Sequence, residues 1–69
     1  MFVRPIDAVQ IVNTDKLRDI RVDDSDILYS TENGTYYLYQ GESEFDAIDK
    51  MADFMKAMKD GVPLYDFNV

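Results

Sequence analysis

The sequence predicts a small α+β domain, a four-stranded antiparallel meander with one C-terminal helix packed across one face. Short segments rich in β-branched and aromatic residues alternate with turn residues in the first half of the chain. One amphipathic segment with a capping residue at each end follows them. The chain has 69 residues and no cysteine, so a single small core must hold the fold without disulfide bonds.

Four segments are expected to be strands because β-branched and aromatic residues dominate them; they are Ala8–Val12, Leu17–Val22, Ile27–Ser30 and Thr35–Gln40. Asn33 and Gly34 lie between the last two segments. This pair predicts a two-residue type I′ turn, because Asn tolerates and Gly readily adopts a positive φ. The turn would place Tyr29 opposite Leu38 in the hairpin.

The two earlier turns are expected to be four-residue loops, which pair Val12 with Leu17 and Val22 with Ile27. Side chains alternate between the two faces of a strand, so these registers define one core face. That predicted core face consists of Val9, Ile11, Ile20, Val22, Ile27, Tyr29, Tyr36 and Leu38.

The opposite face of the predicted sheet carries Leu28, Tyr37 and Tyr39, with Arg21 beside them. An exposed aromatic cluster rimmed by charges often marks a contact site. We therefore expect this face to be covered. The cover would be the chain's own terminal segments, a second copy in a homodimer, or another protein.

The helix is predicted over residues 44–60, with Ser43 as its N-cap and Gly61 just past its end. Its predicted core stripe is Ile48, Met51, Ala52 and Met55. Phe54 and Met58 lie at one edge of that stripe and are further candidate interaction residues. The remaining division is an N-terminal arm at 1–7, the meander at 8–40 and a C-terminal tail at 62–69.

Composition excludes several classes of function. A net charge of −7 disfavours direct nucleic-acid binding and binding to anionic membranes. The absence of both His and Cys removes the usual triads and thiolate nucleophiles, so we expect no enzyme, no metal site and no cofactor. The N-terminus has no signal-like apolar run and no stretch suits a membrane span, which indicates a cytoplasmic location.

The order AVQIVNTDKLRDIRVDD, ILYS and ENGTYYLYQGESEFDAIDKMADFM resembles a loose group of short uncharacterised proteins from phages and integrated elements of Gram-positive bacteria. The resemblance covers residues 8–60. Some proteins of this group inhibit or redirect host and defence enzymes, so the resemblance implies an interaction role.

The leading functional hypothesis is therefore a non-catalytic protein-interaction or regulatory module. One alternative is an acidic mimic that occupies a basic nucleic-acid site on another protein. A second alternative is a structural homo-oligomer. The carboxylates on which the mimic would depend are Asp23, Asp24, Asp26, Asp46, Asp49 and Asp53.

Overall fold

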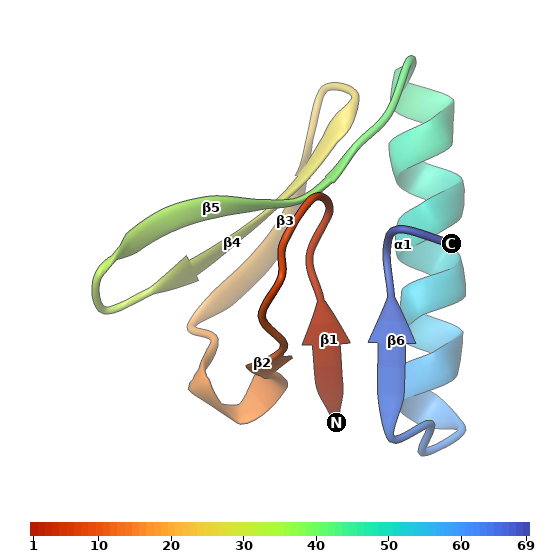
Figure 1. Cartoon of the computed structure of the whole chain (residues 1–69). Coiled ribbons are helices and arrows are strands. Elements are labelled where there is room, and N and C mark those ends of the chain that lie inside the picture. Colours follow the sequence, from red (N-terminus) through yellow and green to blue (C-terminus); the bar gives the residue numbers. More distant parts are fainter.

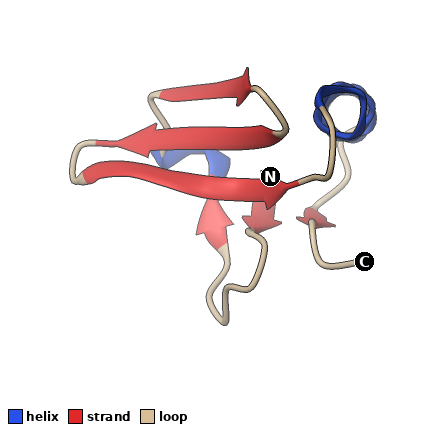
Figure 2. Cartoon of the chain, turned by 90° about the horizontal axis from the view of Figure 1, so that it is seen from above, coloured by secondary structure: helices blue, strands red, loops and turns tan.

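The computed structural model describes all 69 residues and confirms the α+β class. The predicted four-stranded meander is wrong, because the strands form two three-stranded sheets ordered β2-β1-β6 and β3-β4-β5 (Figures 1 and 2). The elements are β1 (Phe2–Arg4), β2 (Val12–Asn13), the 3₁₀ helix η1 (Thr14–Lys16), β3 (Asp19–Asp23), β4 (Asp26–Thr31), β5 (Gly34–Gln40), α1 (Glu44–Lys59) and β6 (Leu64–Asp66).

The β3-β4-β5 sheet is the meander that the sequence predicted, without its first strand. Val22 pairs with Ile27 as expected. The pairing continues to Asp23 and Asp26, so the turn between β3 and β4 is only two residues long. Asp24 in this turn has a φ of 52°, a conformation that Asp tolerates better than most residues.

The register of the β4–β5 hairpin differs from the predicted one by two residues. Thr31 pairs with Gly34, and Tyr29 pairs with Tyr36 rather than with Leu38. Asn33 does not adopt a positive φ, and its backbone N–H donates instead to the Thr31 hydroxyl at 3.1 Å. A shift of two residues preserves the alternation of side chains, so the predicted faces survive near the turn.

The predicted strand Ala8–Val12 is wrong. Residues 5–11 form a loop, in which Val9 is almost fully exposed. Only the end of this segment is extended, and Val12 pairs with Val3 of β1 instead of with Leu17. The strong β propensity of the segment is overridden because β1 offers the pairing partner.

The β2-β1-β6 sheet takes β1 from the predicted N-terminal arm and β6 from the predicted C-terminal tail, and we call it the terminal sheet. β1 lies in the centre and pairs in parallel with β6, so Val3 lies beside Tyr65. The Ile6 N–H donates to the Leu38 carbonyl at 2.8 Å and joins this part of the chain to β5. The termini therefore form a sheet of their own instead of covering the outer face of the meander.

Helix α1 begins and ends nearly where the sequence predicts. The Ser43 hydroxyl accepts from the Asp46 N–H at 3.2 Å, and the Asp46 carboxylate accepts from the Glu42 N–H at 3.0 Å. Gly61 has a φ of 73° just after the last turn, where the left-handed conformation favours glycine. The helix is not long and apolar enough to cross a membrane.

The helix lies beside both sheets (Figure 2), and this position changes which of its faces is buried. The buried core consists of Val3, Ile27, Tyr29, Leu38, Ala47, Phe54 and Phe67. The Phe54 ring lies 5.3 Å from that of Tyr65 and 5.2 Å from that of Phe67. The predicted core stripe is therefore wrong at Ile48 and Met55, which are 46% and 58% exposed, and Ala52 is exposed with them.

The end of β6 is held to β1 by a polar cluster. Arg4 pairs with the Asp66 carboxylate at 3.0 Å, and the Asn68 backbone N–H donates to the same carboxylate at 2.9 Å. The hydrogen bonds from Asn68, together with Arg4, lower the pKa of Asp66. The ionised carboxylate is thus the form that fastens the C-terminal strand.

We expect Phe54→Ala to destabilise the fold by about 3–5 kcal/mol, because it removes a fully buried ring that packs against the rings of Tyr65 and Phe67. A domain of this size has little more stability than that, so the variant should be largely unfolded. Met55→Ala is the matched control and should cost less than about 1 kcal/mol. Urea unfolding followed by circular dichroism measures both, and equal losses would contradict the orientation of the helix.

We expect Asp66→Asn to lower the free energy of unfolding at neutral pH, because the Arg4 ion pair is lost. A carboxyl whose pKa is lowered by folding stabilises the fold above its unfolded pKa. That contribution disappears as the pH falls through the folded value. The difference between the variant and the parent should therefore shrink below about pH 4. Asp49→Asn, which removes the same charge from an exposed helix side chain, is the matched control, and its free energy of unfolding at neutral pH should stay close to that of the parent.

Candidate functional site

The outer face of the meander brings three of the six predicted interaction residues together. Arg21 pairs with Leu28 and Leu28 pairs with Tyr37, so these side chains form one row across three strands. Tyr37 is 50% exposed, and the terminal sheet does not cover it. The next row is polar, since Ser30 hydrogen-bonds with both Arg21 and Thr35. The apolar cluster on this face is thus small.

The other three predicted residues lie elsewhere. A bulge in β5 between the Leu28 and Ile27 pairs turns Tyr39 toward the core edge, where its ring lies 6.2 Å from that of Phe67. Phe54 is fully buried, so it belongs to the core and not to the surface. Met58 is exposed and borders a shallow hollow between the helix and β3.

A row of exposed apolar side chains runs along the helix, and three of the four were predicted to lie in the core. Phe45 is 78% exposed, and Ile48, Ala52 and Met55 are exposed along the same line. We call these four residues the helix seam. They are spaced by three, four and three positions, which are the intervals of the a and d positions in a coiled-coil heptad. The sequence pattern could have indicated this exposed row. The apolar arc covers nearly half of the helix, and packing against a sheet buries only part of such an arc.

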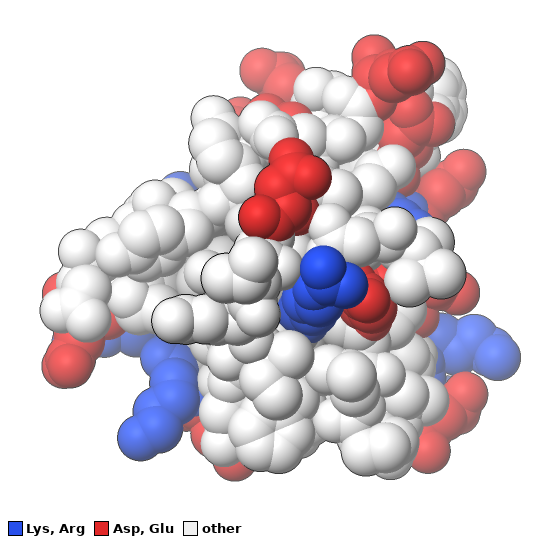
Figure 3. All heavy atoms as spheres, in the orientation of Figure 1, with Lys and Arg blue, Asp and Glu red and all other residues white.

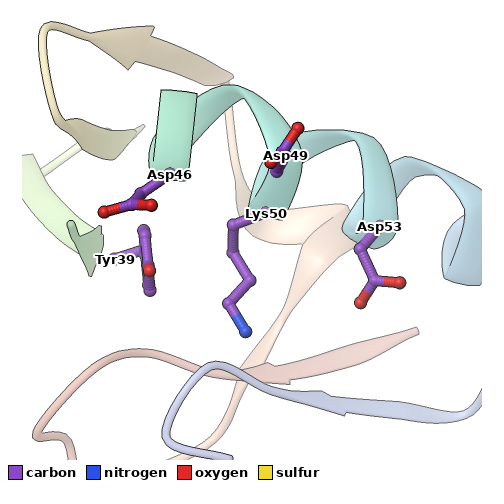
Figure 4. Close-up of a pocket in the computed structure, with 5 residues that line it drawn as sticks. All are labelled: Tyr39, Asp46, Asp49, Lys50 and Asp53. Atoms are coloured by element: carbon purple, nitrogen blue, oxygen red, sulfur yellow. The ribbon is translucent and has the colours of Figure 1, made fainter. Parts of the chain in front are cut away.

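A polar hollow of about 270 Å³ lies on the side of the helix nearest the C-terminus and is lined by Tyr39, Asp46, Asp49, Lys50 and Asp53 (Figure 4). Its side chains mainly hold the end of the chain. Asp53 accepts from the Tyr65 hydroxyl at 2.6 Å, and the Lys50 ammonium donates to the Val69 carbonyl at 3.4 Å. Burial, followed by the Asp53 hydrogen bond, raises the pKa of Tyr65. No group of carboxylates is arranged to hold a metal ion.

A second apolar surface lies on the outer face of the terminal sheet. Phe2 and Leu64 are neighbours in register across β1 and β6, and both are about half exposed. Figure 3 shows this side of the molecule, where charged side chains gather mainly around the outline. The Arg4–Asp66 ion pair interrupts the apolar surface, whereas no charged residue interrupts the four positions of the helix seam.

Comparison with known proteins returns no match: no family model, no curated protein and no solved structure matches this chain.

Proposed function

We propose that this chain is a non-catalytic protein-interaction module that binds an amphipathic helix of its partner along the helix seam. The observation that carries the proposal is the exposure of Phe45, Ile48 and Met55 along one line of the helix, on a face separate from the one that buries Ala47 and Phe54. Large apolar side chains that line up on one exposed stripe are the usual sign of an unfilled interface.

The spacing of the seam indicates what kind of partner fits it. Side chains at a and d intervals insert between the side chains of a facing helix, which must present its own apolar residues at the same intervals. The seam spans three turns of a regular helix, so its residues are held rigidly before binding. A rigid, preformed surface reduces the entropy lost on binding.

The acidic-mimic alternative receives less support, because two helix carboxylates have structural roles. Asp46 caps the helix by accepting from the Glu42 N–H, and Asp53 accepts from the Tyr65 hydroxyl. Both carboxylates thus stabilise the fold instead of standing free in a phosphate-like array. The resemblance to phage and mobile-element proteins adds a regulatory role to our proposal, in which binding redirects the partner.

The proposal predicts binding to a synthetic 21-residue amphipathic peptide with leucine at heptad positions a and d. Titration into the ¹⁵N-labelled chain should shift the amide resonances of Phe45, Ile48, Ala52 and Met55 and leave β1 and β6 unchanged. The matched control is the same peptide with serine at those positions, which should bind at least about tenfold more weakly because it buries little apolar area.

Two outcomes would contradict the proposal. Shifts confined to the outer face of the meander, around Tyr37, would move the site to the other side of the sheet. An absence of shifts at all peptide concentrations, with the chain folded, would show that the seam does not bind helices.

A further inference from the structure

We infer that the partner helix is α1 of a second copy of this chain, packed antiparallel along the helix seam. The inference rests on the proposed function, since it names the partner of the same surface. It makes the folded protein a weakly associating homodimer with a two-fold axis across the middle of the helix.

The distribution of charge along the helix selects this partner and this direction. Glu44 lies in the first turn of the helix and Glu42 just before it, whereas Lys56 and Lys59 lie in the last turn. Lys56 also pairs with Asp60 at 3.6 Å, which leaves the C-terminal end with a net positive charge. An antiparallel pair places the acidic end of each helix beside the basic end of the other. A parallel pair would place like charges together and align the two helix dipoles unfavourably.

Two antiparallel copies of the helix also place each seam residue opposite another seam residue. With the two-fold axis at the level of position 50, Phe45 of one copy lies opposite Met55 of the other, and Ile48 lies opposite Ala52. Each layer then joins a larger side chain to a smaller or more flexible one, and the small Ala52 lets the helices approach closely near the axis. All four layers are apolar.

The size of the interface sets the expected strength. The helix of 16 residues is about 24 Å long. Four side chains over that length bury less than the roughly 800 Å² per partner of a standard stable interface. The net charge of −7 on each copy adds a long-range repulsion. We therefore expect dissociation constants in the micromolar range or above.

A small domain gains from a second buried surface. Only seven side chains form the core, and a chain of this length supplies about 3–5 kcal/mol of stability on its own. Dimerisation stabilises the folded state through mass action, because the unfolded chain does not present the seam. The melting temperature should therefore rise with protein concentration.

The first test is sedimentation velocity of the full chain from about 10 µM to 1 mM. The parent should shift from monomer to dimer, and Ile48→Gln with Met55→Gln should stay monomeric throughout that range. The matched control is Phe2→Gln with Leu64→Gln, which replaces side chains of similar exposure on the terminal sheet. This control should dimerise like the parent. The reverse pattern would place the interface on the terminal sheet and overturn the inference.

The second test probes the charge pairing directly. Lys56→Glu with Lys59→Glu should weaken the dimer at least tenfold, and so should Glu42→Lys with Glu44→Lys, because each makes both ends of the helix alike. An equimolar mixture of the two variants should recover association, since every end then meets an opposite charge. Thermal melts of each variant confirm folding, and no recovery on mixing would overturn the inference.

The two proposals fail in different ways. If the amphipathic peptide binds the seam but the parent chain remains monomeric at about 1 mM, the seam serves another protein and only the dimer is wrong. If the peptide does not bind and the chain remains monomeric, the interaction role of the seam fails as well.

Discussion

The fold depends on one aromatic contact, in which Phe54 of α1 packs against Tyr65 of β6 and Phe67 just after it. The rings lie close enough for the tilted and edge-on packing that aromatic pairs prefer, and two of the three are fully or almost fully buried. This contact joins the helix to the terminal sheet. This contact also limits how the helix can pack on the meander, because one side of the helix contributes to a core shared by both sheets.

That position explains why the helix seam is exposed. A helix that packs on a single sheet turns the middle of its apolar stripe toward that sheet. Here the contact with β6 draws Ala47 and Phe54 into the core, so the opposite edge of the stripe faces solvent. The same rotation makes Phe54 a core residue and Ile48 a surface residue. One long-range contact therefore decides both the interior and the candidate binding surface.

Sequence reasoning predicted the features that local chemistry determines. The N-cap at Ser43 and the end of the helix before Gly61 were correct, because the residue types act on their own neighbours. The pairing of Val22 with Ile27 was also correct. The sequence carried no comparable signal for the parallel pairing of β1 with β6, which joins segments about 60 positions apart. Because this pairing was not predicted, the terminal segments were assigned to no sheet, and the helix was oriented as if it packed on the meander alone.

The candidate site shows the same division. The row of Arg21, Leu28 and Tyr37 follows from alternation along strands and was predictable. Tyr39 leaves the outer face because of a bulge, and no residue of β5 indicates that bulge in the sequence. The exposure of the seam depends on tertiary packing alone, although its spacing was visible in the sequence.

The pairing of the two ends of the chain also has a consequence for how the protein is made. Val3 and Phe67 occupy the same core, so the core lacks an essential part until β6 has left the ribosome. The meander and helix can form their local hairpins and turns earlier, but parallel contacts of high sequence separation close late and slowly. During that interval the nascent chain exposes the apolar side of α1 together with the ring of Phe54. Until β6 pairs with β1, that exposed apolar surface makes the chain prone to aggregation.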